Sequence, residues 1–253
     1  MKYYGDHHLP QIIIACCTSM ASALFPRVSW LGASFKAIQQ ANRVKLILKD
    51  SNKGESIIGL GQYYNSFISS QINQGKSPDT ILVFCHDDIY LHDWNLAWVL
   101  NEGLNRYDLI GPIGCREASS DQPGWASELS TAGRHKFLPF SRVKPSGSIN
   151  HYDYLRVIPD CHPPIGQPCV LLDGCFLAIR LGTLMRHTDL RFDEQFRFHC
   201  YDSDFCRQVL TLGLTIGSWP ILVSHQSGGT FGDDWSDAAL RFQKKWAKRP
   251  LNI

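Results

Sequence analysis

The chain has 253 residues, of which 44% are hydrophobic and 19% are charged. A chain of this length and apolar content can bury a substantial core without disulfides or structural metals, which excludes an intrinsically disordered protein. The formal net charge of +2 is too small to indicate a protein that binds nucleic acid. No apolar run approaches the roughly 20 residues of a membrane-spanning helix, so we expect a soluble, globular protein.

The nine cysteines indicate reduced, structural thiols. They are odd in number, include no Cys-x-x-Cys pair, and in places lie inside apolar runs, as Cys85 does. The apolar residues before Cys17, followed by Ala21-Ser22-Ala23, imitate a secretory signal, but the apolar run is short. We therefore expect a buried first strand and a protein of a reducing compartment, the cytoplasm.

Strand and helix patterns alternate along the first half of the chain. Continuous apolar runs predict buried strands, and apolar residues at helical spacing predict helices. In chain order we expect a strand over 11–17, a helix over 30–41, a strand over 44–48, a helix over 59–74, a strand over 80–85, a helix over 94–104 and a short strand over 108–113. This alternation predicts an α/β fold with a mixed, mostly parallel sheet flanked by helices.

The second half begins with a different kind of segment. Residues 114–168 are rich in Gly, Pro, Ser, His and aromatic residues without sustained periodicity, which predicts functional loops. Beyond them we expect strands over 169–172 and 176–179, helices over 180–187 and 201–212, a strand over 214–223 interrupted near Pro220, and a basic amphipathic helix over 237–248. With no repeat and no linker, the whole chain, 1–253, is expected to form one domain.

The clearest chemical signal is His86-Asp87-Asp88, directly after the buried strand 80–85. Ligands of open α/β sheets collect beyond the carboxyl ends of the strands. Two carboxylates there can hold a hard divalent cation whose other ligands are phosphate oxygens and water. The competing interpretation is an ordinary turn that caps the next helix.

Two later positions carry similar signals. Asp202 and Asp204 open the helix predicted over 201–212, where the helix dipole favours carboxylates. They point in different directions, so only one can cap well and the other is free to act as a base. His225 ends a strand beside glycines and could contact a metal or a phosphate, although a lone His is often only a satisfied polar residue.

Taken together, the motifs resemble those of family 2 glycosyltransferases with a GT-A fold. The likeness lies in the order and spacing of short motifs between Ile12 and Gly229, which are Cys17-Thr18-Ser19, Asp50-Ser51-Asn52, Tyr64-Asn65, His86-Asp87-Asp88, Asp173-Gly174-Cys175, Tyr201-Asp202-Ser203-Asp204 and His225. The bacterial subgroup whose acidic motif reads His-x-Asp instead of Asp-x-Asp is the most similar. The resemblance implies a GT-A-like, Rossmann-like domain in which 114–168 is a loop-rich insertion on the acceptor side.

The resemblance also implies roles for individual residues. On the donor side, Thr18, Asp50, Asn65, His86 and Asp87 would bind the nucleotide sugar; Asp50 would recognise the base, and His86 stands where the family more often has Asp. Asp88 and His225 would bind a divalent cation, Mn²⁺ or Mg²⁺, shared with the diphosphate. Asp202 would be the catalytic base, although Tyr201 replaces the Glu that usually precedes it. Asp173, Gly174 and Asp204 would lie on the acceptor side.

The expected function is therefore transfer of a sugar, with inversion, from a nucleotide sugar to a hydroxyl of a glycan or lipid-linked acceptor, as in bacterial surface polysaccharide synthesis. A cation stabilises the diphosphate leaving group, and a carboxylate takes the proton of the acceptor hydroxyl. Aromatic residues of the insertion (Trp125, His135, Phe137 and Phe140) could stack on sugars or simply pack. The alternatives are a metal-dependent phosphoesterase and a non-catalytic nucleotide-sugar-binding protein.

The C-terminal segment 237–253 is expected to form a basic helix. Ala239, Phe242 and Trp246 share one face, which predicts packing against the domain. Basic residues crowd the other faces (Arg241, Lys244, Lys245, Lys248 and Arg249). They are either solvated or dock the protein on anionic lipid at the inner membrane.

Overall fold

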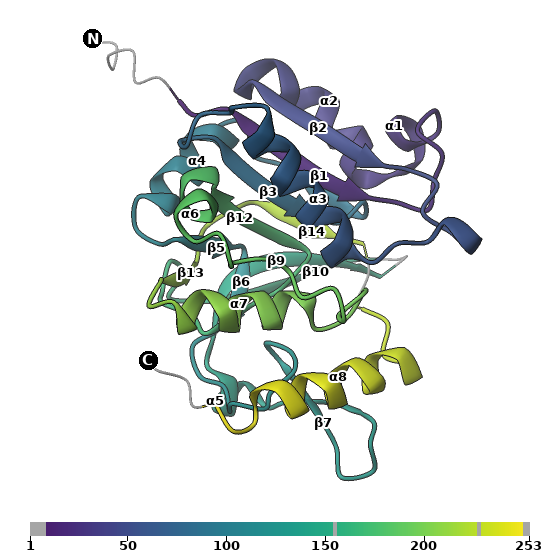
Figure 1. Cartoon of the computed structure of the whole chain (residues 1–253), viewed down its shortest axis with the longest axis vertical. Helices are drawn as coiled ribbons and strands as arrows, with labels where there is room; N and C mark the ends of the chain where they lie inside the picture. Colours follow the sequence, from purple (N-terminus) through teal and green to yellow (C-terminus); the bar gives the residue numbers. More distant parts are fainter. Residues whose placement is uncertain (1–8, 154–155, 227–228, 250–253) are drawn as a thin grey trace.

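The computed structural model describes residues 9–153, 156–226 and 229–249. It is a mixed α/β fold in which helices cover a main sheet and a second sheet lies beside it (Figure 1). The main sheet has the strand order β13-β5-β12-β3-β1-β2. Its strands are β1 (Ile12–Cys17), β2 (Val44–Lys49), β3 (Ile81–Cys85), β5 (Leu109–Gly111), β12 (Phe176–Arg180) and β13 (Ile216–Ser218).

Five strands of the main sheet run in one direction, and β12 runs against them. β1 pairs in parallel with β2 and β3, and β13 pairs in parallel with β5. β12 lies between β3 and β5 and is antiparallel to both. The mixed, mostly parallel sheet expected from the alternating pattern is therefore present.

The central strands β1 and β3 of the main sheet are buried on both faces, which is why they are continuous apolar runs. Ile13, Leu82 and Phe84 belong to one hydrophobic core, whereas Ile14 and Val83 belong to the other. Helices α3 (Leu60–Asn73), α6 (Leu181–Arg186), α7 (Tyr201–Thr211) and α8 (Asp233–Trp246) contribute to the first core. Helices α2 (Trp30–Asn42) and α4 (Leu96–Leu104) contribute to the second.

The second sheet has the order β11-β6-β9-β14-β4, with β10 paired to β9. Its strands are β4 (Ile89–Leu91), β6 (Ile113–Cys115), β9 (Pro145–Asp153), β10 (Arg156–His162), β11 (Leu171–Leu172) and β14 (Val223–His225). A separate pair consists of β7 (Ser127–Leu129) and β8 (His135–Phe137). Short helical segments complete the chain: α1 (Phe25–Val28), η1 (Gly54–Ser56) and α5 (Phe140–Val143).

Three expectations for the secondary structure were wrong. The segment 114–168 is not merely loops, because the long antiparallel pair β9 and β10 lies within it. Much of β10 is exposed, so its sequence lacks the apolar alternation of a half-buried strand. The strand expected over 108–113 is two strands, β5 and β6, and the strand expected over 214–223 is β13 and β14, each pair divided between the two sheets.

Helix α8 begins at Asp233, four residues before the start that its apolar pattern predicts. Its apolar face packs against the domain, as expected. Ala239, Phe242 and Trp246 are buried. Figure 1 shows α8 beside α7, and the ion pair from Lys245 to Asp204, 2.7 Å, joins the two helices. Residues 250–253 of the predicted basic segment lie outside the described residues.

The chemistry of the cysteines agrees with the expectation of structural thiols. All nine are free, and most are buried, with Cys17 partly and Cys161 fully exposed. Burial raises the pKa of Cys17 and Cys169 to about 11, so these thiols stay protonated at neutral pH. In the described part of the chain, no helix is long and apolar enough to cross a bilayer.

Candidate functional site

The site lies where the main sheet passes into the second sheet. Strand β3 ends at Cys85, the turn 86–88 follows, and β4 of the second sheet begins at Ile89. β14 pairs with β4 so that His225 lies opposite Ile89, and the Gln226 amide donates to the Asp88 carbonyl at 3.0 Å. Two strands from different parts of the chain therefore bring His225 to the turn at the carboxyl end of β3.

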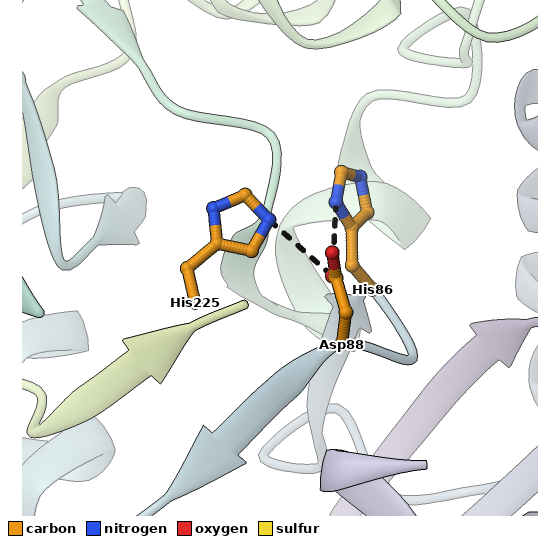
Figure 2. A group of neighbouring side chains, drawn as sticks. All are labelled: His86, Asp88 and His225. Atoms are coloured by element: carbon orange, nitrogen blue, oxygen red, sulfur yellow. Dashed lines mark ion pairs between the residues drawn. The ribbon is translucent and has the colours of Figure 1, made fainter. Parts of the chain in front are cut away.

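His86, Asp88 and His225 form a compact set of donor atoms (Figure 2). The His225 Nε2 lies 3.3 Å from Asp88 Oδ1, and the His86 Nδ1 lies 3.9 Å from the same oxygen. One ligating atom from each residue lies within 4.8 Å of the other two. The structure thus brings together the predicted ligands Asp88 and His225, and adds His86, which the sequence had placed on the nucleotide side.

The two histidines have opposite electrostatic environments. Burial and nearby His225 lower the pKa of His86, which favours its neutral imidazole. Burial alone would also lower the pKa of His225, but the hydrogen bond and charge of Asp88 raise it above its usual range. A neutral imidazole and a carboxylate offer the lone pairs that a cation needs.

The turn Asp173-Gly174-Cys175 leads into β12 beside this set. The Asp173 carboxylate accepts from the Cys175 amide and from the Trp125 indole, each at 2.9 Å. Burial would raise the pKa of Asp173, but the charge of His225 and these hydrogen bonds hold it below its ordinary value. Asp173 is therefore ionised at neutral pH.

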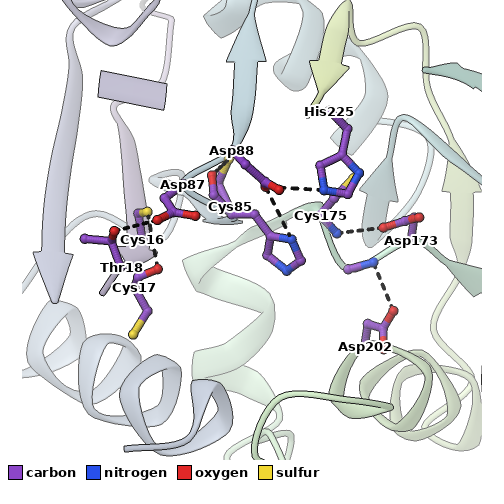
Figure 3. A network of polar contacts seen from close by, with 12 residues as sticks. Cys16, Cys17, Thr18, Cys85, Asp87, Asp88, Asp173, Cys175, Asp202 and His225 are labelled. Carbon is purple, nitrogen blue, oxygen red and sulfur yellow. Dashed lines mark hydrogen bonds and ion pairs between the residues drawn. The ribbon is translucent and has the colours of Figure 1, made fainter. Parts of the chain in front are cut away.

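Asp202 lies on the other side of that turn, in the first turn of α7 (Figure 3). Its Oδ2 accepts from the Gly174 amide at 3.0 Å. Burial, followed by the charge of Asp173, raises the pKa of Asp202 from 3.8 to about 7. Two neighbouring carboxyl groups with pKa values driven apart are typical of an acid–base site.

The donor-side residues near β1 lie together. The Thr18 hydroxyl, at the end of β1, donates to Asp87 Oδ2, as Figure 3 shows. Asp50 follows β2 and accepts from the Ser22 amide at 2.9 Å, and this bond lowers the pKa of Asp50. Thr18 and Asp87 thus join the end of β1 to the turn 86–88, and Asp50 follows the neighbouring parallel strand β2.

Two predicted site residues have structural roles. The Asn65 amide group is bonded to the segment before α7: it donates to the Phe192 carbonyl at 2.8 Å and accepts from the Phe192 amide at 2.9 Å. The Asn65 side chain thus joins α3 to the segment before α7, and its place in a nucleotide pocket stays a prediction. Asp204 is fully buried and accepts from Lys245, Trp246 and Gln208, each at 2.7 Å. Asp204 thus joins α7 to α8, which is the support of helix geometry that the sequence offered as one of its roles, and its acceptor-side role stays a prediction.

The aromatic residues expected to stack on sugars divide into two groups. The Trp125 indole anchors Asp173, and the His135 ring stacks on Phe231 with centroids 3.6 Å apart. Phe137 and Phe140 are largely exposed. Both also contact aromatic rings of the protein, Phe137 those of His135 and Phe231, and Phe140 that of His162.

Two further residues shape the site but were not assigned from the sequence. Tyr201 was noted only as the replacement for Glu, yet its hydroxyl contacts both His86 and Gly174. Cys200 adopts a left-handed conformation, with φ of 60°, just before α7. No local signal marks such a non-glycine residue, because this conformation is uncommon for it.

Lys245 was expected on the exposed basic face of α8, and this was wrong. Its ammonium group contacts Asp193 and Asp204, each at 2.7 Å. Arg241 and Lys244 remain exposed on that helix, and Lys248 is exposed just beyond its end. Docking on anionic lipid stays a prediction that now depends on fewer charges.

Comparison with known proteins gives little further information. No family model matches the chain. No curated protein matches it. A solved structure entitled "Crystal Structure of A197 from STIV" covers 85% of this chain and 82% of that chain at 12% identity, with a TM-score of 0.41. A likeness at this level identifies neither a family nor a function.

Proposed function

We propose that this protein is a metal-dependent, inverting glycosyltransferase of the GT-A type, which moves a sugar from a nucleotide sugar to a hydroxyl of a glycan or lipid-linked acceptor. One observation carries the proposal. A candidate cation-binding set, His86, Asp88 and His225, is connected through the Gly174 turn to a carboxyl group, Asp202, whose pKa is about 7. Charge stabilisation of a leaving group and proton removal from a nucleophile are the two needs of this reaction.

The arrangement of the main sheet supports the proposal. Parallel strands β1, β2 and β3 direct their carboxyl ends toward Thr18, Asp50 and the turn 86–88. Binding at the carboxyl ends of parallel strands is the general rule for nucleotides in open α/β sheets. The antiparallel β12 brings the Asp173-Gly174 turn to the same region, because it enters the sheet where β3 leaves it.

The donor set fits a divalent cation and favours Mn²⁺ over Mg²⁺. Two imidazoles and one carboxylate suit a borderline transition metal, whereas Mg²⁺ prefers oxygen ligands alone. His86, Asp88 and His225 would hold the ion, which when bound would neutralise charge on a diphosphate leaving group. Thr18, Asp87 and Asp50 are placed to contact the nucleotide.

Asp202 would take the proton from the acceptor hydroxyl. A base with a pKa near the working pH is half ionised and can accept a proton readily. The Gly174 amide holds its Oδ2, and Asp173, anchored by Trp125, keeps a negative charge beside it. A single base acting on the acceptor gives one displacement and therefore inversion at the sugar carbon.

One observation bears on the phosphoesterase alternative. His151 lies next to His225 across β9 and β14, with ring centroids 5.9 Å apart, and contacts Asp160, which His162 also contacts. Hydrolases with two metals need a second set of ligands of this kind close to the first. Among the described residues, however, only His86, Asp88 and His225 offer ligating atoms that all lie within 4.8 Å of one another. We therefore favour a single cation and a transferase.

The test is nucleoside diphosphate binding by thermal shift, with and without Mn²⁺. A ligand at about 100 times its Kd adds about 2.7 kcal/mol to the free energy of unfolding. We expect Mn²⁺ to strengthen this stabilisation in the wild type and in the control Asp237→Asn, an exposed carboxylate on α8, but not in Asp88→Asn. Equal stabilisation with and without Mn²⁺ in all three proteins would contradict the metal assignment. Release of free sugar or phosphate at the same rate without an added acceptor would favour the phosphoesterase.

A further inference from the structure

The Tyr201 side chain connects the cation-binding set to the turn that carries Asp173. Its ring is buried, with 2% exposure, and packs near Tyr64 and Phe192. Its hydroxyl oxygen lies 2.8 Å from His86 Nε2 and 2.8 Å from the Gly174 carbonyl oxygen. Both distances are those of good hydrogen bonds.

These two contacts determine which nitrogen of His86 carries the proton. A phenol has one hydrogen to donate, and the Gly174 carbonyl can only accept. The Tyr201 hydroxyl therefore donates to Gly174 and accepts from His86, so His86 Nε2 bears the hydrogen. The opposite assignment would leave the Gly174 carbonyl facing an oxygen lone pair.

The other nitrogen, Nδ1, then carries a lone pair toward the cation-binding set. It lies 3.9 Å from Asp88 Oδ1, beyond hydrogen-bond distance. Two atoms that each lie about 2.1 Å from one cation can be this far apart, so the separation is compatible with both atoms binding the same ion.

We propose that Tyr201 is a positioning residue that fixes His86 as its Nε2–H tautomer and so presents Nδ1 as a ligand to a divalent cation shared with Asp88 and His225. The presence of the cation rests on the proposed function. The assignment of the His86 tautomer does not, because it follows from the Tyr201 contacts. Outer partners of this kind orient metal-binding histidines, and their loss commonly costs about 10- to 100-fold in metal affinity.

The same contacts link the cation-binding set to Asp202. The Tyr201 hydroxyl donates to the Gly174 carbonyl. The Asp202 carboxylate, from the residue after Tyr201, accepts from the Gly174 amide. A Cβ on Gly174 would lie 2.7 Å from both the Tyr201 hydroxyl and Asp202 Cβ, so this packing admits only glycine. The left-handed Cys200 sets the start of α7 from which both side chains reach the turn.

The test compares Tyr201→Phe with the matched control Tyr64→Phe. Both variants remove one buried phenol hydroxyl from the same aromatic cluster, but within the described part of the chain the Tyr64 hydroxyl has no hydrogen-bond partner. Ring ¹⁵N spectra of the metal-free proteins report the His86 tautomer. We expect the Nε2–H tautomer in the wild type and in Tyr64→Phe, and a mixture of tautomers in Tyr201→Phe.

Mn²⁺ titration provides the second measurement. We expect Tyr201→Phe to bind Mn²⁺ about 10- to 100-fold more weakly than the wild type, and Tyr64→Phe to bind it equally well. In a His86→Gln background, Tyr201→Phe should have little additional effect, because the hydroxyl acts through His86. An unchanged tautomer in Tyr201→Phe overturns the proposal, as does an equal loss in both backgrounds. Absence of Mn²⁺ binding by the wild type would refute the metal site of the proposed function, and the tautomer spectra would still decide the role of Tyr201.

Discussion

Replacing Asp202 by Asn should make the protein more stable and less active. In the unfolded chain this carboxyl group has a pKa of 3.8, and in the folded protein its pKa is raised to about 7 by burial and by the charge of Asp173. The folded state therefore binds the Asp202 proton more tightly than the unfolded state. Binding of this proton therefore stabilises the folded state fully below pH 4, and this stabilisation is lost as the pH rises through 7.

The magnitude follows from the size of that pKa difference. Each pKa unit corresponds to about 1.36 kcal/mol, so the full difference would amount to about 4 kcal/mol. Asp202 is partly exposed, and solvent screening reduces this value, so we expect about 2–4 kcal/mol. Asn is neutral at every pH and can still accept from the Gly174 amide, so it avoids the cost of burying charge beside Asp173.

Urea denaturation between pH 4 and pH 8.5 measures this effect. The free energy of unfolding of Asp202→Asn should equal that of the wild type near pH 4 and exceed it above pH 7.5. Above pH 7, where the wild-type carboxylate is ionised, sugar transfer should fall by about 10²- to 10⁴-fold, as expected for loss of a general base, and the difference should shrink as the pH falls below 7. Parallel stability curves for the two proteins would refute the raised pKa, and nearly unchanged transfer would refute the role as base.

Two other substitutions test neighbouring parts of the site. Asp204→Ala should destabilise the protein by about 1–3 kcal/mol in urea, because the donors of Trp246 and Gln208 lose this buried acceptor and Lys245 keeps only Asp193; unchanged or increased stability would contradict the structural role. Gly174→Ala should cost about 1–3 kcal/mol and weaken Mn²⁺ binding, because its Cβ meets Tyr201 and Asp202 at 2.7 Å. Gly232→Ala is its control, since a Cβ there meets nothing within 4 Å, and equal effects of the two would contradict this reasoning.

The regular elements that pack on the main sheet could be predicted because their signal is local. Strands β1 and β3 are buried on both faces, so their sequences are uninterrupted apolar runs. Helices α3 and α7 bury one face and show helical spacing. The second sheet was largely missed, because β10 is exposed and β4 and β14 are only three residues long.

The sequence could predict the location of those candidate site residues that lie at the ends of strands. Asp88 follows β3 and His225 ends β14, so both lie at strand ends, where ligands collect. Asn65 and Asp204 could not be judged in this way, because their partners lie elsewhere in the chain. Asn65 is bonded to Phe192, and Asp204 to Lys245 and Trp246.

The contacts of Tyr201 depend on its being a phenol. A carboxylate at this position would be drawn toward a cation or a proton donor, whereas a phenol donates to the Gly174 carbonyl and accepts from His86. His86 is complementary to this phenol, because an imidazole whose Nε2 bears the hydrogen needs a partner that can accept from it. In our proposal the side chains at positions 86 and 201 therefore act as a pair, His86 as a ligand and Tyr201 as the group that orients it.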